Sequence, residues 1–76
     1  MYNFRDLSCL DEGETGVVFG LTAAGGMRRR LLDLGVIEGT RIVCVKKSHC
    51  GDIAAYEIRG ALIALRRENA REVVIS

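Results

Sequence analysis

The second half of the chain constrains the fold most strongly, because its apolar residues recur at every second position between short glycine turns. This period of two is typical of β-strands with one face in a core. It predicts strands over residues 40–47, 53–58 and 61–66. Arg59 and Gly60 form a two-residue hairpin turn between the last two, in which glycine supplies the positive φ. We expect these two strands to bury the following side chains: Ala54, Tyr56, Ile58, Ile63 and Leu65.

Two further strand-like segments flank this region. Residues 14–21 contain a run of β-branched and aromatic side chains, which favours a strand, and residues 73–75 form a last short strand. Gly16 and Gly20 suggest bends or bulges in the first of these segments. Residues 68–71 are short and helix-prone, and we expect a single 3₁₀ turn there.

One amphipathic helix is expected between the first and second strands. Thr22 is a suitable capping residue, and the helix would begin near Ala23 or Ala24. Its apolar stripe has the spacing i, i+4 and i+7 and comprises Met27, Leu31 and Leu34. Gly35 follows this stripe and fits a left-handed helix stop, and Gly39 turns the chain into the next strand.

The number of strands limits the architecture. Five short strands in 76 residues cannot cover a flat sheet on both sides. Curling the sheet into a small barrel removes most of its exposed edges and encloses one core. We therefore expect a mainly β fold, namely a small SH3-like barrel of about five strands with one α-helix inserted between strands one and two. A chain of this length is expected to form a single domain over residues 1–76.

Charge and cysteine content argue against several functional classes. The formal net charge is +1, whereas general nucleic-acid binders are strongly basic. The cysteines, at 9, 44 and 50, are odd in number and follow no secretory signal, which favours reduced thiols in a cytoplasmic protein. No apolar run approaches the roughly 18 residues that a membrane span needs, so we expect any membrane association to go through a partner.

Several short motifs follow one another along the chain. In order they are Gly13-x-x-Gly16-x-Val18, Arg29-Arg30-Leu31-Leu32-Asp33-Leu34-Gly35-Val36-x-x-Gly39, Gly51-Asp52, and Ile63-Ala64-Leu65-Arg66 followed by Ala70. This ordered set resembles the FeoA family, small cytosolic accessory proteins of bacterial ferrous iron transport. The resemblance implies an SH3-like barrel and a partner, the FeoB transporter, whose cytosolic G domain binds GTP. This sequence departs from the family pattern at Gly51-Asp52-Ile53, where the family often has Gly-Asp-Pro.

The consecutive arginines Arg28, Arg29 and Arg30 are the candidate partner-binding residues. Guanidinium groups can hold carboxylates in two-point contacts, so this helix face could dock an acidic partner. The alternative is a solvated helix face that keeps the protein in solution, with the stem of Arg30 covering part of the core. A phosphate contact is a third alternative, but with so low a net charge we expect no nucleic-acid partner.

His49 and Cys50 are the candidates for a metal site, in a turn around Gly51 and Asp52. Two ligands are too few, since protein metal sites usually need three or four, so we expect neither a metal nor a cofactor. Cys44 lies within a strand, where a buried thiol acts as a small hydrophobe. No catalytic triad or phosphate loop is present, and we expect no enzymatic activity.

The apolar residues Phe4, Leu7 and Leu10, and the pair Val36-Ile37, could either plug the barrel or form an exposed patch for a partner. Taken together, the sequence predicts a non-enzymatic accessory protein of ferrous iron uptake that binds the cytosolic part of a FeoB-type transporter. The alternative is a metal- or repressor-linked interaction domain, resembling the C-terminal SH3-like domain of DtxR-type regulators. The exposed edges of such a barrel would allow weak self-association.

Overall fold

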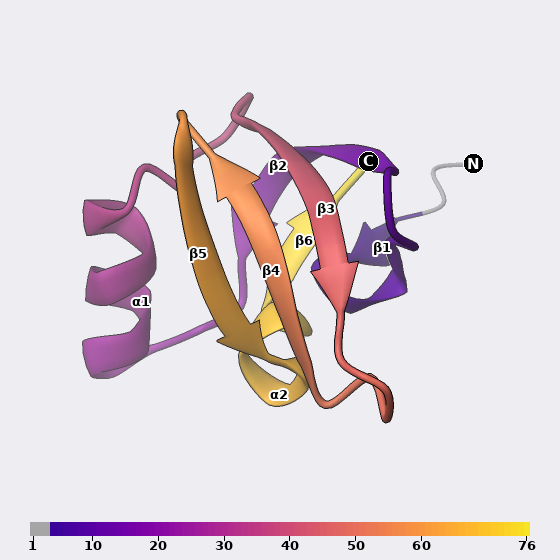
Figure 1. Ribbon diagram of the computed structural model, residues 1–76. Helices are drawn as coiled ribbons and strands as arrows, with labels where there is room; N and C mark the ends of the chain where they lie inside the picture. The colour runs from indigo at the N-terminus through magenta and orange to yellow at the C-terminus, as the bar shows by residue number, and fades with distance from the viewer. Residues whose placement is uncertain (1–3) are drawn as a thin grey trace.

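A computed structural model of the protein describes residues 4–76. It is built mainly from β-strands, with one helix of nine residues (Figure 1). The elements are, in chain order, β1 (Arg5–Asp6), a 3₁₀ turn (Leu7–Cys9), β2 (Thr15–Leu21), α1 (Gly25–Asp33), β3 (Arg41–Lys47), β4 (Ile53–Ile58), β5 (Ala61–Arg66), α2 (Arg67–Ala70) and β6 (Val73–Ile75). Within these residues, no helix has the length and hydropathy needed to cross a lipid bilayer.

The strands form one antiparallel sheet in the order β1-β6-β2-β3-β4-β5. β2 belongs to both halves of this sheet, because its first residues pair with β3 and its last residues pair with β6. The register shifts between Val18 and Gly20, and such a bulge bends the strand and increases its twist. The sheet therefore curls around a core, with β3, β4 and β5 in front of β1 and β6 in Figure 1.

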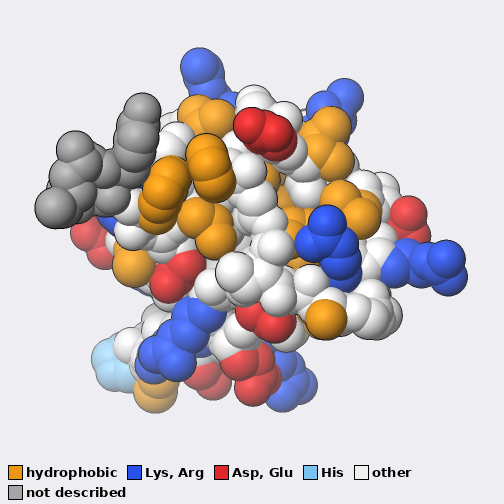
Figure 2. All heavy atoms as spheres, turned by 180° about the vertical axis from the view of Figure 1, so that it is seen from behind, with side chains coloured by type: hydrophobic (Ala, Val, Ile, Leu, Met, Phe, Trp, Pro, Cys, Tyr) orange, Lys and Arg blue, Asp and Glu red, His pale blue; other side chains and the backbone are white. Residues whose placement is uncertain are grey.

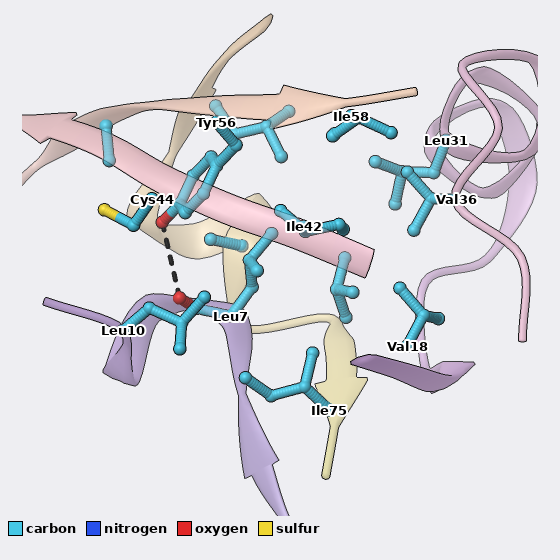
Figure 3. Close-up of a cluster of buried hydrophobic side chains, with 14 of the residues drawn as sticks. Leu7, Leu10, Val18, Leu31, Val36, Ile42, Cys44, Tyr56, Ile58 and Ile75 are labelled. Carbon is cyan, nitrogen blue, oxygen red and sulfur yellow. Dashed lines mark hydrogen bonds between the residues drawn. The ribbon is translucent and has the colours of Figure 1, made fainter. Parts of the chain in front are cut away.

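The core lies inside this curl and receives side chains from both halves of the sheet and from α1. Tyr56, the largest fully buried side chain, hydrogen-bonds through its hydroxyl to the carbonyl oxygen of Leu7 at 3.4 Å (Figure 3). Leu31 of α1 lies beside Val36 and Ile58 at the other end of the cluster. Most of the predicted inward-facing side chains are buried, namely Ala54, Tyr56, Ile58 and Leu65, and Ile63 is partly buried against them.

The structure confirms the mainly β fold with a helix between the first two long strands, and it corrects several details. There are six strands in the described chain rather than five, because Arg5 and Asp6 pair with β6. Thr22 does not cap α1. The helix begins at Gly25 without a side-chain cap, and the main-chain N–H of Thr22 donates instead to Glu72 as an extension of the pairing between β2 and β6.

Two local expectations about short segments also need correction. The short helix after β5 is an α-helical turn that begins at Arg67, one residue earlier than expected, and not a 3₁₀ turn. The bulge in β2 lies next to Gly20, as the sequence indicates, but Gly16 pairs in regular register with Ile42. Gly16 instead provides close packing, because a Cβ atom there would lie 2.6 Å from Cδ1 of Ile75.

This close approach predicts that Gly16→Ala lowers the free energy of unfolding by roughly 1–3 kcal/mol, the usual cost of overpacking a core. Ile75 is fully buried and cannot swing into solvent to make room. Gly20→Ala is the matched control, since a Cβ there meets nothing within 4 Å. Urea denaturation of the two variants tests the prediction. Equal stabilities would show that Ile75 adapts and that the glycine is not needed for packing.

Candidate functional site

The arginine run lies on α1, and a single fully buried side chain fixes the orientation of that helix. Leu31 is completely buried, whereas the neighbouring Arg28, Arg29 and Arg30 are all exposed. The helix ends in a Schellman arrangement: the N–H of Gly35 donates to Leu32 and that of Val36 donates to Leu31, both at 3.0 Å.

The three arginines have different surroundings. Nη1 of Arg28 lies 3.4 Å from the carbonyl oxygen of Leu21, so this side chain reaches back toward the end of β2. Arg30 lines a hollow between α1 and the end of β5. The one ion pair within residues 4–76 joins Lys47 to Asp11, so Arg29 and Arg30 have no carboxylate partner there. Two guanidinium groups of the run are therefore available to an acidic ligand.

Two adjoining hollows form a groove, which we call the arginine groove. The smaller, of about 250 Å³, is lined by Arg30, Ile53, Ala64, Leu65, Arg66 and Asn69. The larger, of about 560 Å³, is lined by Cys50, Asp52, Ile53, Arg66, Arg67, Glu68 and Arg71. Because Ile53 and Arg66 line both hollows, the groove runs continuously from α1 past the end of β5 to α2.

Arg67 has a structural role in this groove. Its Nη2 and Nε atoms donate to the carbonyl oxygens of Cys50 and Gly51 at 2.9 and 3.1 Å, and its main-chain N–H donates to Asp52. Gly51 has a φ of +75° and lies so close that a Cβ would approach Arg67 Nη2 to 3.1 Å. Arg67 thereby fastens the turn between β3 and β4 to α2, which leaves Arg30, Arg66 and Arg71 as the groove arginines whose side chains form no hydrogen bond or ion pair among residues 4–76.

The side chains of the same turn form a small hydrogen-bond network. The Ser48 hydroxyl donates to Asp52 at 2.7 Å and accepts from the main-chain N–H of Ile53 at 3.2 Å. The bond from Ser48 lowers the pKa of Asp52 below its usual value. A proline at position 53 would lack the N–H that Ser48 accepts, so this turn uses the isoleucine to close its network.

The candidate metal ligands are not gathered. His49 and Cys50 are both exposed on the turn, and no group of three or more His, Cys, Asp or Glu side chains suited to hold a metal ion occurs in the described residues. Cys9 is exposed near Asp6, and Cys44 is buried in β3. Burial raises the pKa of the Cys44 thiol, so it remains protonated and packs as an apolar group.

The apolar candidates divide between core and surface. Leu7, Leu10 and Val36 are fully buried, so they plug the barrel. Phe4 and Phe19 are about half exposed and lie with ring centroids 4.5 Å apart. Figure 2 shows hydrophobic side chains exposed on the face opposite to that of Figure 1, among separated acidic and basic groups.

The sequence alone did not link Arg66 and Arg71 to the arginine run. The adjacent pair Arg66-Arg67 was visible as a local excess of charge, but its role depends on which residues face it across the fold. The curl of the sheet and the position of α1 bring Arg30 to the same groove as Arg66. The remaining predicted turn glycines have the expected backbone: Gly35, Gly39 and Gly60 all have φ between +85° and +94°.

Comparisons of the sequence and of the structure with known proteins both find matches over nearly the whole chain. A curated relative, the Fe(2+) transport protein A/Fe(2+) transporter FeoB fusion protein of Porphyromonas gingivalis, is 30% identical over 69 residues. This match covers 91% of the present chain, which spans only 8% of the relative's length.

Solved structures share the fold. FeoA of Stenotrophomonas maltophilia, described as an SH3 domain protein and complexed with zinc, matches with a TM-score of 0.84 and 27% identity over 93% of this chain and 88% of its own. A manganese-dependent transcriptional repressor matches with a TM-score of 0.87 over 100% of this chain and 42% of its own, at 19% identity, which shows a shared fold alone. The SH3-like architecture is thereby confirmed. Since the model of the FeoA domain also matches residues 5–76, the chain belongs to the FeoA family.

Proposed function

We propose that this protein is a non-enzymatic accessory protein of ferrous iron uptake, which acts in the cytoplasm by binding the cytosolic part of a FeoB-type transporter. The observation that carries this proposal is the fusion protein of Porphyromonas gingivalis, in which a region similar to this chain is joined to a FeoB transporter. Joining two binding partners in one polypeptide raises their effective concentration, so fusion favours pairs that work in contact.

The chemistry of the surface supports a binding role. Within residues 4–76 the exposed arginines of α1 have no carboxylate partner, and the helix that presents them is held to the core through Leu31. Arginine on a rigid element is suited to two-point recognition of carboxylates at an interface. We therefore assign the partner contact to the basic face of α1, with Arg29 and Arg30 as its central residues.

Charge reversal tests this assignment. Arg29→Glu combined with Arg30→Glu should weaken binding to the purified cytosolic part of a FeoB-type transporter at least ten-fold, about 1.4 kcal/mol. The reason is that each substitution replaces an attraction to an acidic partner by a repulsion. Isothermal titration calorimetry, with and without GTP, measures the effect. The loss should be larger at low ionic strength, since salt screens exposed charges.

The control is a second double reversal placed elsewhere on the surface. Arg5→Glu with Arg41→Glu changes the net charge equally, at exposed positions of β1 and β3. It should leave binding within about two-fold of the unmodified protein. Unchanged binding by the α1 variant, with its fold intact by circular dichroism, would contradict the assignment of α1. Absence of binding by the unmodified protein would contradict the proposed function itself.

A further inference from the structure

The two ends of the sheet differ in what they offer to another chain. At one end β1 has only two residues, and a very short edge strand is a common protection against unwanted pairing. At the other end β5 has six residues and, among residues 4–76, pairs with β4 alone. It carries neither proline nor lysine, and its Leu62 is 67% exposed. β5 is therefore the longer of the two edge strands, and the smaller hollow lies between its outer edge and α1 (Figure 1).

The register of the hairpin shows which main-chain groups of β5 point outward. Ile58 and Ala61 flank the two-residue turn as partners, and hydrogen-bonded and non-hydrogen-bonded pairs alternate from there. The N–H and C=O groups of Leu62 and Ala64 therefore point away from β4. In the described part of the chain no other strand pairs with that side of β5. The free edge can supply the main-chain hydrogen bonds that bind an extended peptide.

The surroundings of this edge specify the charge of the peptide. The arginine groove passes Ala64, with Arg30 on the side of α1 and Arg66 and Arg71 toward α2. The two carboxylates of the larger hollow are Asp52, which accepts from Ser48, and Glu68. Four arginines against two carboxylates leave an excess of positive charge, and none of these arginines forms an ion pair within residues 4–76.

We propose that the free edge of β5 and the arginine groove together bind an extended acidic segment of the partner by strand addition. Main-chain groups of Leu62 and Ala64 pair with the segment, and its carboxylates pair with Arg30, Arg66 and Arg71. Leu62, Ala64 and Arg66 share one face of β5, so the residues that alternate with the carboxylates point to the opposite face, on the side of the partly buried Ile63. This inference rests on the proposed adaptor function and narrows the chemistry of its partner.

A second copy of this chain is the competing occupant of the edge, and charge disfavours it. Pairing two β5 edges would bring two arginine grooves together, and like charges at an interface oppose association. A partner segment rich in aspartate or glutamate has the complementary charge. If the protein alone formed a concentration-dependent dimer that protected the amides of Leu62 and Ala64 from exchange, the edge would belong to a second copy and the proposal would be overturned.

The first experiment uses a defined probe. A short blocked peptide in which glutamate and valine alternate is titrated into the full-length protein and followed by nuclear magnetic resonance. We expect shifts and slower hydrogen exchange at the amides of Leu62 and Ala64. A peptide of the same length in which lysine replaces glutamate should bind at least ten-fold more weakly. Shifts confined to other surfaces, equal binding of the lysine peptide, or no binding would overturn the proposal.

Substitutions then distinguish the contribution of the main-chain edge of β5 to peptide binding from the contribution of the arginine side chains. Ala64→Pro removes an outward N–H without removing a hydrogen bond to β4, and edge strands tolerate proline at such positions. It should weaken the glutamate peptide about ten-fold, whereas Ala64→Val, which keeps the N–H, should not. Arg66→Glu with Arg71→Glu should weaken the peptide at least ten-fold, and Arg5→Glu with Arg41→Glu, which changes the net charge equally, is the control. If Ala64→Pro bound the peptide as well as the unmodified protein does, strand addition would be contradicted. If the double variant at Arg66 and Arg71 did so, the arginine contacts would be contradicted.

The same variants distinguish this inference from the proposed function. Arg66 and Arg71 lie outside α1, so their reversal does not alter the helix face assigned above. If the unmodified protein binds the cytosolic part of the transporter and these variants bind it equally well, the strand-addition site is wrong and the adaptor function stands. If the unmodified protein does not bind it, the adaptor function itself fails.

Discussion

Replacing Leu31 with alanine should lower the free energy of unfolding by about 2–5 kcal/mol, the range for truncating a buried leucine. Leu31 is the one fully buried residue of α1, and it packs beside Val36 and Ile58 (Figure 3). A domain of this size has a stability on the order of 3–5 kcal/mol, so the loss could consume most of it. Urea denaturation followed by circular dichroism measures the change.

Leu32→Ala is the matched control for this prediction. The two leucines are adjacent on the same helix, but Leu32 is 41% exposed, so its truncation leaves no cavity in the core. We expect its cost to stay below about 1 kcal/mol. Similar losses for the two variants would show that burial of Leu31 does not hold α1 in place. The comparison also bears on function, because α1 carries Arg30 to the groove.

The second large effect is a loss of stability at alkaline pH. Burial, with smaller contributions from Cys44 and Asp6, raises the pKa of Tyr56 from 10.0 to about 12. The folded protein therefore holds the tyrosine proton more tightly than the unfolded chain does. The stabilisation that protonated Tyr56 contributes is fully present below about pH 10, and it is lost as the pH rises through the pKa of Tyr56 in the folded protein. We expect a loss of about 1 kcal/mol by pH 11 and roughly 2–3 kcal/mol above pH 12.

Urea denaturation between pH 8 and about pH 12 in roughly half-unit steps measures this loss, and Tyr56→Phe provides its control. The variant cannot ionise there and should show a flatter alkaline dependence. At neutral pH it should lose about 0.5–1.5 kcal/mol, because the hydroxyl no longer donates to Leu7. Some alkaline loss should remain, since the pKa of the buried Cys44 is also raised. An unchanged alkaline dependence in Tyr56→Phe would contradict the assignment to Tyr56.

Much of the fold could be predicted from local patterns. The alternation over β4 and β5 placed their core residues correctly, because side chains of a strand point to opposite faces in turn. The helix stop at Gly35 was visible because a left-handed residue after an apolar stripe favours glycine. The cap of α1 was not predictable in this way. Thr22 suits a helix start, yet its N–H pairs with Glu72, a residue from the far end of the sequence.

The candidate site could be predicted only in part. The arginine run was evident from the sequence. The sequence did not show that Arg28 reaches back to Leu21 or that Arg30 lines a groove. Arg67 resembled its neighbour Arg66 in sequence, and only the structure shows that it fastens the turn at Cys50 and Gly51. Side chains with the same charge acquire different roles through the main-chain groups that happen to face them, and those groups belong to distant segments.

The sequence by itself determined the class of fold, the inserted helix and the positions of the turns, because these follow from periodicity and backbone preferences within a few residues. Only the tertiary structure decided that β5 would be a free edge and that Arg30 would share a groove with Arg66 and Arg71. That outcome depends on the order in which strands pair and on the bend of β2 at its bulge. Both are set by packing of the whole core, which no local segment of the sequence encodes.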